Sequence, residues 1–596
     1  MSSQFALFKT RRFAPLFGTQ FLGAFNDNLY KNALVVLLTF QTAQWTSMKP
    51  EILANLAAGI FISPYFFFSA TAGQLADKYD KAWLARFSKV LEIVIMLVAA
   101  AGFWFTSLPV LMVALFLLGA QSTLFGPVKY AILPQHLGEN ELVGGNAMVE
   151  AGTFVAILIG TLAGGLLAGV VDQPVWIAFV GIAVALLGYL TSRGIPAAPA
   201  PEPELKVNFN FVTETWRNIS FTRKNRTVFL SILGISWFWL YGALFLAQLP
   251  AYGRLVLGGT ESTVTLLLAT FTVGIGLGSM LCERLSGKHV EMGLVPLGSI
   301  GLTIFALDLG LFSPVPALAG TALSVGQLLA MPQIWRVLFD LTMLGIFGGF
   351  FTVPLYAMMQ VYSDAETRAR TVAANNIFNA LFMVVGAVAA AGMLALGASI
   401  ANLFLITAIC NALVALYIYG LLPEFLQRFV VWLIVHTATK LETEGVEENV
   451  PERGAAVLVF EEATPVNVLA MMASCRRPIR FVVPQAFLKK SLLGFVLRQS
   501  AAIALEDERA MQEIQATLKA GDLLGLSESA WAAMDWQQQQ DFAWIPAVQL
   551  QLCEEKAGGL LARLSGRLAG APFQSRFPAR IVLTASPAKA CNPKSE

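Results

Sequence analysis

Polar and charged side chains inside otherwise apolar stretches are the residues of this chain whose types and spacing suit chemistry. The stretch FLGAFNDNLYKNAL places five of them, Asn32 included, within about two helical turns. Such residues are costly in a bilayer unless they are paired or face a polar route, so their positions are informative. We predict that a polar path is lined by residues from several helices: Asn26, Asp27, Asn28, Lys31, Glu92, Gln121, Lys129, Asn146, Glu150 and Asn376.

Two pairs in this set share a helix face because their members are four residues apart. Asp27 and Lys31 can neutralise each other, and Asn146 and Glu150 also lie on one face. The first pair either lines the path or only locks helix packing. Each of the other residues, taken singly, fits bonding between helices or a place near the membrane surface equally well. Their occurrence together is what favours a path.

The composition places these residues in a membrane protein. Of the 596 residues, 56% are hydrophobic and 13% are charged, and the mean hydropathy is +0.65. Soluble domains carry about 25% charged residues. From Phe13 to about Leu422 the chain has twelve apolar runs separated by polar breaks, and such runs fit spans of about 20 residues. We predict an all-α membrane protein with twelve transmembrane helices, followed by a small cytosolic α/β domain.

Several classes of partner are disfavoured. A formal net charge of +2, with no basic run that has interleaved aromatic residues, argues against nucleic acid. The five cysteines and three histidines are dispersed without CxxC or other metal-ligand spacing. We therefore expect no disulfide framework, no metal site and no cofactor.

Lys and Arg residues in the connections set the orientation of the spans, because positively charged loops stay in the cytoplasm. With the N-terminus inside, 17 of these residues, Lys89 among them, fall on the cytoplasmic side. Only Lys49, Arg254 and Arg336 fall on the opposite side. We therefore predict that both termini are cytoplasmic.

A long polar break divides the twelve spans six and six, and its prolines, in AAPAPEPELK, cannot continue a helix. The halves resemble each other weakly, since the fourth span ends TLFGPVKYAIL and the tenth contains GFFTVPLYAMM. Two related halves are typical of a transporter that rocks about a site between them. The predicted segments are an N-terminal half (1–192), a cytoplasmic linker (193–226), a C-terminal half (227–422), an interfacial helix (423–445) and an α/β domain (446–596).

Between the second and third spans the chain reads GQLADKYDKAWLARFSK. This string resembles the G-x-L-a-D-r-x-G-r-r motif of the major facilitator superfamily, with Asp80 in place of the second glycine. Gly73 lets two helices approach closely, and Asp77 meets the positive end of a helix or a basic side chain. A weaker copy, GSMLCERLSGKHV, retains Gly278 and Lys288. The conformational latch that this resemblance implies consists of Gly73, Asp77, Lys78, Lys81 and Arg284.

Three further strings narrow the resemblance: FLGAFNDNLYK, GPVKYAILP and NAMVEAGTF. They are similar to the lysophospholipid transporter family, whose members flip lysophospholipids from the outer to the inner leaflet of a bacterial inner membrane. The resemblance implies that activity and location, with Asp27, Lys129 and Glu150 along the substrate path. One departure is that stand-alone members carry an arginine in the seventh span, where this chain reads SWFWLYGALFLAQLPAY without a base.

The segment from about Phe425 resembles a glycerophospholipid acyltransferase, on strings such as ENVPERGAAVLVF. In that family an H-x-x-x-x-D pair supplies a general base and the carboxylate that orients it. Here Glu462 and Asn467 stand at those two positions, and only Glu528 remains of the F-P-E-G turn. We expect a degenerate acyltransferase-like domain that is not an enzyme.

The sequence thus favours a membrane transporter that moves lysophospholipids, such as lysophosphatidylethanolamine, by alternating access. Its candidate partners are the lysophospholipid, the bilayer and a separate acyltransferase. Three alternatives stay open: transport of another amphiphile, an acyltransferase, and a lipid-binding scaffold that does not transport.

Overall fold

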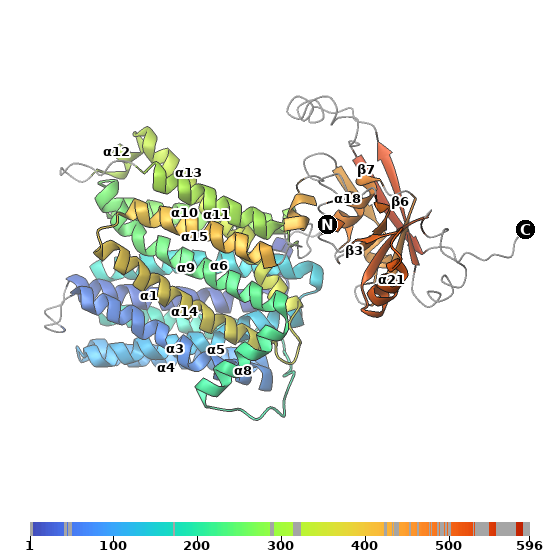
Figure 1. Ribbon diagram of the computed structural model, residues 1–596. Helices are drawn as coiled ribbons and strands as arrows, with labels where there is room; N and C mark the ends of the chain where they lie inside the picture. The colour runs from blue at the N-terminus through green and yellow to red at the C-terminus, as the bar shows by residue number, and fades with distance from the viewer. Residues whose placement is uncertain are drawn as a thin grey trace, which may run out of the picture. The chain divides into compact units, whose positions relative to one another are not determined.

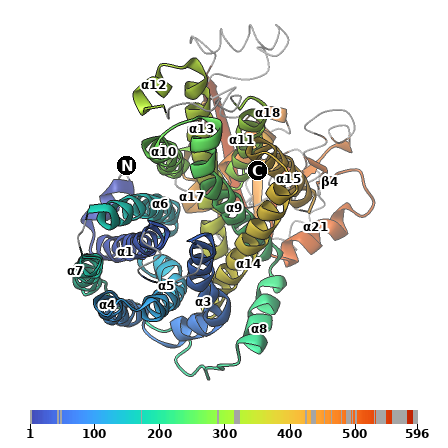
Figure 2. The ribbon, with the colours of Figure 1, turned by 90° about the vertical axis from the view of Figure 1, so that its left-hand side faces the viewer.

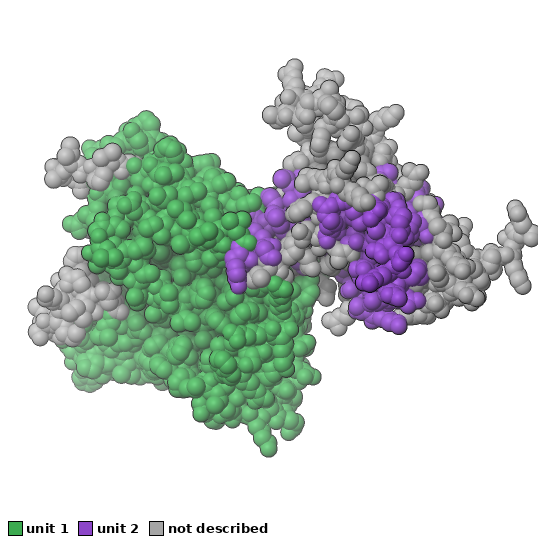
Figure 3. Space-filling view, viewed as in Figure 1, with its two compact units in different colours: residues 1–290, 297–416 green, residues 291–296, 417–596 purple. Residues whose placement is uncertain are grey.

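The computed structural model forms two compact units (Figure 3). Unit 1 contains residues 1–290 and 297–416, and unit 2 contains residues 291–296 and 417–596. The residues that the structure describes are 4–40, 45, 50–170, 173–286, 291–313, 323–421, 426–431, 433, 440–451, 454–461, 464–475, 477, 479–485, 488, 494, 497–498, 502–528, 530, 547–555 and 580–587.

Unit 1 is a bundle of long helices (Figure 1). The N-terminal half has α1 (Ala14–Phe40), α3 (Pro50–Lys78), α4 (Lys81–Trp104), α5 (Leu108–His136), α6 (Glu139–Val170) and α7 (Val175–Ser192). The C-terminal half has α9 (Arg226–Ala251), α10 (Glu261–Leu285), α11 (Leu294–Leu311), α13 (Pro332–Val361), α14 (Arg368–Ala395) and α15 (Ile400–Leu421). Short elements η1 (Gln4–Lys9), η2 (Tyr252–Val256) and α12 (Val325–Leu329) accompany them.

These helices match the twelve predicted spans. Eleven of the described helices are long and apolar enough to cross a membrane. The twelfth, α1, lacks the required hydropathy because it carries the polar residues of FNDNLYKN. The shortest spans, α7 and α11, have 18 residues each, or about 27 Å, which is close to the ~30 Å of a hydrocarbon core.

Successive helices run in alternate directions, so the bundle has two ends. We call the end at which α1 begins the N-terminal end of the bundle. The helices α3, α5, α7, α10 and α13 finish at this end, and α4, α6, α9, α11 and α14 begin there (Figure 1).

The two halves repeat one packing scheme. In the N-terminal half α1 packs along α6 and α3 along α5; in the C-terminal half α9 packs along α14 and α10 along α13. Figure 2, which looks along the helices, shows the two groups side by side. The repeat confirms the predicted two-half bundle. Across the interface α3 packs on α14, and its counterpart α10 packs on α6.

Glycines four residues apart bring paired helices together within each half. On α6, a Cβ at Gly160 or Gly164 would lie 2.4 or 2.3 Å from backbone oxygens of α1. On α10, a Cβ at Gly274 or Gly278 would lie 2.4 or 2.1 Å from backbone oxygens of α13. Small residues at this spacing let helix backbones touch in membranes. Gly278 therefore packs within its own half and does not join the two halves.

The linker between the halves contains a helix, α8 (Phe211–Lys224). It follows the proline-rich stretch that was predicted to interrupt helical structure. The Asn210 side chain accepts hydrogen bonds from the backbone N–H groups of Val212 and Thr213 and caps its first turn. The helix α8 packs on α3, α9 and α14, so it connects both halves.

Unit 2 is built on a seven-stranded sheet with the order β1-β7-β6-β2-β5-β3-β4. Its strands are β1 (Lys440–Glu444), β2 (Ala456–Phe460), β3 (Ile479–Val483), β4 (Ile503–Ala504), β5 (Leu523–Ser527), β6 (Ala547–Glu555) and β7 (Arg580–Pro587). All neighbouring pairs are parallel except β6 and β7. Four of the strands were predicted from the runs AAVLVF, RFVV, AIALE and VQLQL.

Helices cover both faces of this sheet. Alternate residues of a strand point to opposite faces: Leu458 of β2 belongs to the apolar core that includes α18 (Pro465–Ser474), and Val457 to the core that includes α21 (Ala510–Lys519). The short helix α17 (Val446–Asn449) follows β1. Coverage of both faces explains why these strands are continuous apolar runs.

The predicted interfacial helix over 423–445 is only partly present. Residues 426–431 and 433 are helical among those described. Strand β1 occupies Lys440–Glu444 and pairs with β7, so the boundary at 445 is wrong. The sequence around β1 did not predict this strand, because its partner lies about 140 residues later in the chain.

The contact between α10 and α13 generates a prediction about stability. Gly278→Ala places a methyl group against the Ile346 carbonyl oxygen, and overpacking of this kind costs about 1–3 kcal/mol. The thermal midpoint of the detergent-purified chain should therefore fall by several degrees. Gly276→Ala is the matched control, because nothing lies within 4 Å of a Cβ there. Equal shifts in the two variants would contradict the close contact.

Candidate functional site

A group of mutually bonded polar residues lies inside the N-terminal half, where α1, α4 and α5 meet. The Glu92 carboxylate accepts hydrogen bonds from Asn26 Nδ2 at 2.8 Å and Lys89 Nζ at 2.6 Å. Gln121 Nε2 lies 3.4 Å from the same carboxylate and donates to Ser88 Oγ at 2.7 Å. We call these five residues the Glu92 cluster.

Burial makes the Lys89–Glu92 pair a packing element. The two side chains are 1% and 0% exposed, and removing one partner of such a pair costs about 3–5 kcal/mol because it leaves a buried charge. The assignment of Lys89 to a cytoplasmic connection is therefore wrong: it lies two turns inside α4, neutralised by Glu92. Asn26 and Gln121 bond to the same carboxylate, which favours helix packing over a substrate path for them.

Asp27 and Lys31 do not form the predicted ion pair. Ser122 Oγ donates to Asp27 Oδ2, while Lys31 Nζ donates to Asn28 Oδ1 at 3.0 Å and lies 5.2 Å from the centre of the Phe61 ring. Each charge has found a different partner, which spacing along α1 alone did not reveal. The second carboxylate oxygen of Asp27 is buried without a hydrogen-bond partner among the described residues.

A second group of contacts crosses from one half to the other. The Tyr130 hydroxyl of α5 donates to the Glu150 carboxylate of α6. The Tyr130 ring stacks on that of Tyr356 from α13, with centroids 4.5 Å apart and planes 7° apart. Trp239 Nε1 of α9 donates to the Tyr356 hydroxyl at 3.0 Å. With Lys129 these residues form what we call the Lys129 cluster.

The Lys129 ammonium differs from those of Lys31 and Lys89, which bond to side chains of their own helices. It lies 4.7 Å from the centre of the Tyr130 ring and within electrostatic reach of Glu150 and Asp27. Within the part of the chain that the structure describes, it makes no hydrogen bond or ion pair. Because an unpaired ammonium is costly away from water, we infer that it faces water or a ligand.

Asn146 joins the two halves. Its side-chain amide exchanges two hydrogen bonds with that of Gln360 on α13, at 2.8 and 2.9 Å, and both residues are buried. Asn376 of α14 packs against α5, where a Cβ at Gly126 would lie 2.6 Å from its Nδ2. Gln360 was not predicted, although it is a lone glutamine in the apolar run LYAMMQVY.

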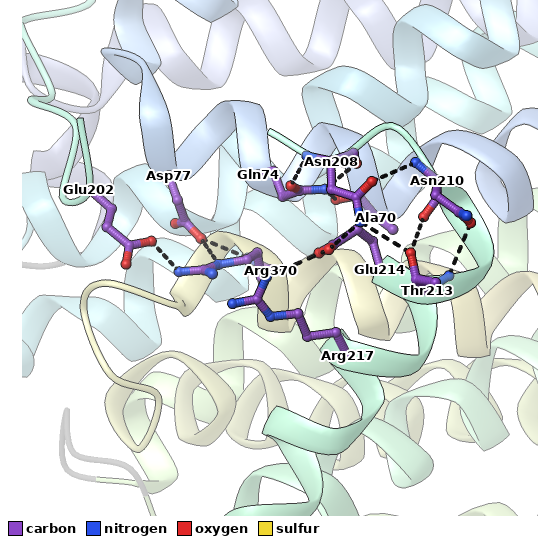
Figure 4. A network of polar contacts seen from close by, with 10 residues as sticks. All are labelled: Ala70, Gln74, Asp77, Glu202, Asn208, Asn210, Thr213, Glu214, Arg217 and Arg370. Carbon is purple, nitrogen blue, oxygen red and sulfur yellow. Dashed lines mark hydrogen bonds and ion pairs between the residues drawn. The ribbon is translucent and has the colours of Figure 1, made fainter. Parts of the chain in front are cut away.

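The predicted latch joins α3 to the first turn of α14 (Figure 4). Asp77 accepts hydrogen bonds from the backbone N–H groups of Ala369 and Arg370 at 3.2 and 3.3 Å, and from Arg370 Nε at 2.9 Å. Gly73 permits this approach, since a Cβ there would lie 2.7 Å from the Ala373 Cβ. Asp77 thus meets both a positive helix end and a basic side chain.

Arg370 binds a second carboxylate, that of Glu202 in the linker. Figure 4 shows the guanidinium between the two acids. Its side chain is 4% exposed, so these charge-assisted contacts are shielded from solvent. The sequence analysis did not identify Arg370 as the partner of Asp77, because 293 residues separate the two. It also did not identify Glu202 as the second acid bound by Arg370. We call Gly73, Asp77, Glu202 and Arg370 the latch.

The other predicted latch residues that the structure describes make no hydrogen bond to Asp77, although Lys81 lies within its electrostatic reach. Lys81 is buried, and its Nζ has no hydrogen-bond partner in the described ranges. Lys78 Nζ lies 5.8 Å from the centre of the Tyr79 ring. Arg284 is exposed in the last turn of α10, and Lys288 lies outside the described residues. The basic role is therefore filled by Arg370.

Hydrogen bonds between the halves gather at one end of the bundle. They include the Asp77 contacts, the Asn146–Gln360 pair and a bond from Gln4 Nε2 to the Met280 carbonyl oxygen at 3.1 Å. All lie toward the N-terminal end of the bundle. The halves are therefore held together at that end.

In unit 2, two of the predicted acyltransferase positions follow neighbouring parallel strands. Asn467 lies in the first turn of α18, after β2. Glu528 follows β5 and accepts a hydrogen bond from Gln549 Nε2 at 2.7 Å. The ends of β2 and β5 are in register, so both residues lie at one edge of the sheet; Glu462 lies outside the described residues. No group of three or more His, Cys, Asp or Glu suited to a metal ion occurs in the described chain.

Comparison with solved structures shows the fold. The human organic anion transporter MFSD10 (TETRAN) matches with a TM-score of 0.52 at 14% identity, over 68% of this chain and 99% of that one. FucP, a major facilitator superfamily transporter in the outward conformation, matches with a TM-score of 0.53 at 14% identity, over 68% and 97%. At this identity the likeness concerns the fold alone.

Sequence comparison shows the family. Residues 16–320 match the model described as Major Facilitator Superfamily. The protein named lysophospholipid transporter LplT of Escherichia coli O1:K1 / APEC is 30% identical over 348 residues, which cover 57% of this chain and 78% of that protein. Its namesake in Shigella boydii serotype 4 (strain Sb227) is 31% identical over 348 residues. The chain, with its two six-helix halves and its latch, therefore belongs to the major facilitator superfamily and, within it, to the family of the lysophospholipid transporters LplT.

Proposed function

We propose that this chain moves lysophospholipids from the outer to the inner leaflet of a bacterial inner membrane by alternating access of its two halves. The observation that carries the proposal is the Lys129 ammonium, which lies beside the interface of the halves without a described protein partner. A lipid phosphate would supply that partner, since Lys is a good point charge for phosphate. The name of the relatives supports this class of cargo.

The two halves offer different surfaces to such a lipid. The N-terminal half carries Lys129, Glu150 and Asp27, whereas α9 of the opposite half contributes aromatic side chains and, after Arg226 at its start, no base. Trp239 of α9 stacks on Phe154 of α6, with centroids 5.9 Å apart. We assign the phosphate to Lys129 and the single acyl chain to the aromatic side of the interface, because a one-tailed lipid needs one polar and one apolar region.

We assign the N-terminal end of the bundle to the cytoplasm. Without Lys89, 15 Lys and Arg residues of the connections that the structure describes lie at that end, against Arg254 and Arg336 at the other, which is the bias expected of cytoplasmic loops. Because hydrogen bonds between the halves lie at this end, this assignment makes the structure a state closed toward the cytoplasm. Release into the inner leaflet then requires the latch and the Asn146–Gln360 pair to open.

We also propose that unit 2 is a degenerate acyltransferase-like domain without catalytic activity. An acyltransferase of this type needs a general base for the lipid hydroxyl. The position of that base holds Glu462, and His436 is the last histidine of the sequence. The amide of Asn467, at the second position, carries no carboxylate to orient a base. One role left for unit 2 is to bind lysolipid or a separate acyltransferase.

The role of Lys129 generates the first functional prediction. Lys129→Ala should lower uptake of labelled lysophosphatidylethanolamine by spheroplasts that lack other lysolipid importers by roughly 10- to 100-fold, since a hydrogen bond to a charged group contributes about 1.5–3 kcal/mol. Asp27→Ala should also lower uptake. Arg254→Gln, an exposed change at the opposite end, should not. Unchanged uptake in Lys129→Ala at matched expression would contradict the assignment, and no uptake by the unaltered chain would exclude this cargo.

The latch generates a second prediction. Asp77→Asn and Arg370→Gln should each reduce uptake about tenfold or more, because each leaves a buried charged or polar group without its partner. The double variant should be no slower than the slower single variant, since both changes remove one contact. Glu204→Gln, an exposed acid of the linker, is the control. Fully multiplicative losses in the double variant would contradict a shared contact.

The third prediction concerns unit 2. The purified full-length chain, supplied with labelled lysophosphatidylethanolamine and an acyl-CoA donor, should form no diacyl product above the level without protein. An active glycerophospholipid acyltransferase assayed in parallel is the control for the donor and the detergent. Product that grows with the amount of this chain would show that unit 2 is an enzyme.

A further inference from the structure

The linker helix α8 presents its side chains in an inverted arrangement. The residues buried against the bundle are polar: Glu214, Asn218 and Thr222. The exposed residues include large apolar ones, with Trp216 66% exposed and Val212 60% exposed. Figure 2 shows α8 at the outer edge of the bundle.

This arrangement is unfavourable for a helix that faces water. Leaving an aromatic or aliphatic side chain in water forgoes about 1.5–3 kcal/mol of burial free energy for each residue. Burying an acid and an amide adds a desolvation cost unless they are bonded. The same arrangement is favourable if the outer face of α8 contacts an apolar medium, as the lipid-facing side of a span does.

The outer face of α8 is continuous with a lipid-facing surface of the bundle. The Phe211 ring of α8 packs edge-to-face on Phe67 of α3, with centroids 5.5 Å apart. Phe67 is 42% exposed within a candidate membrane span, beside the similarly exposed Phe66 and Phe68. The apolar surface of α3 therefore extends onto the start of α8.

Basic side chains also lie on the exposed face. Arg217, Arg223 and Lys224 are all exposed. Arg217 lies 3.6 Å from Glu214 but remains 55% exposed, so its guanidinium is open to further ligands. A helix with Trp and Phe next to Arg and Lys is typical of one that lies in the membrane interface, where the bases meet lipid phosphates.

We propose that α8 is a lipid-binding helix that lies in the headgroup region of the leaflet at the N-terminal end of the bundle. Val212 and Trp216 reach the acyl chains, and Arg217, Arg223 and Lys224 bind the phosphates of anionic phospholipids. This site is distinct from the Lys129 cluster, and it does not depend on which cargo the chain transports.

The site is physically connected to the latch. The Phe221 ring of α8 lies 5.6 Å from the Arg370 guanidinium. The Gln74 side chain of α3 exchanges two hydrogen bonds with the backbone of Asn208, at 2.8 and 3.0 Å, and Asn208 Nδ2 donates to Glu214 at 3.0 Å (Figure 4). Lipid that holds α8 in place therefore also supports the residues that close this end.

The position of α8 is tested by spin-label accessibility in the full-length chain. Nitroxides are attached to Val212→Cys and Trp216→Cys, in a background without native cysteines, in nanodiscs of phosphatidylcholine and phosphatidylglycerol at 3:1. Both labels should resemble Leu97→Cys, on the lipid-facing side of α4, in being reached by oxygen and shielded from a nickel chelate. The water reference is Glu204→Cys. Nickel accessibility equal to that of Glu204→Cys would overturn the proposal.

The lipid charge is tested without altering any cysteine. Native mass spectrometry counts phosphatidylglycerol bound to the full-length chain as lipid is added. Changing Arg217, Arg223 and Lys224 together to Gln should weaken this binding about tenfold or more, since each base near a membrane surface contributes about 1 kcal/mol. The matched control changes Lys9, Arg193 and Lys206, three exposed bases at the same end, to Gln. This control should weaken phosphatidylglycerol binding less than twofold. Equal weakening by both sets would overturn the assignment to α8.

Discussion

A polar group inside a bilayer has no water to bond with, so it must find a partner in the protein or face a route that admits water or a ligand. This constraint sorts the polar residues of the bundle into two kinds. Glu92 and Lys89 neutralise each other in a closed group that holds three helices together. Lys129 has no such partner among the described residues, although Glu150 lies nearby. An unsatisfied charge beside the interface of the halves is what separates the Lys129 site from the packing role of the Glu92 cluster.

The latch applies the same constraint at the interface of the halves. The first N–H groups of any helix lack partners within that helix. At α14 they are capped by Asp77, which belongs to the other half. Closing the two halves and capping a helix are therefore one contact, and opening leaves a helix end, an acid and a base to be rehydrated. A contact of this kind favours discrete closed and open states over a continuous range.

The sequence predicted the features that depend on local pattern. Apolar runs predicted the twelve spans. The string GQLADKYDK predicted that Asp77 meets a positive helix end or a basic side chain. Prediction from the sequence failed for residues whose bonding partner is distant in the chain. Spacing along one helix suggested an Asp27–Lys31 pair, but Ser122 from α5 takes the carboxylate. The sequence analysis placed Lys89 in a loop, because periodicity does not report depth in the membrane. In the structure Lys89 is buried beside Glu92.

The α/β unit shows the same limit. Its parallel strands were visible as apolar runs, because both faces of the sheet are covered. Strand β1 was hidden within an expected helix, since it forms only by pairing with β7. The positions of Asn467 and Glu528 at one edge of the sheet follow from strand register, which no local pattern encodes.

The central claim is that Lys129 receives the lipid phosphate, and equilibrium binding to the purified full-length chain tests it most directly. Binding of lysophosphatidylethanolamine would be compared with that of a monoacylglycerol of the same chain length, which lacks the phosphate, for the unaltered chain and for Lys129→Ala. The account predicts that the substitution weakens binding of the phospholipid by at least tenfold and leaves that of the monoacylglycerol unchanged. Equal effects on both ligands, or none on the phospholipid, would contradict it.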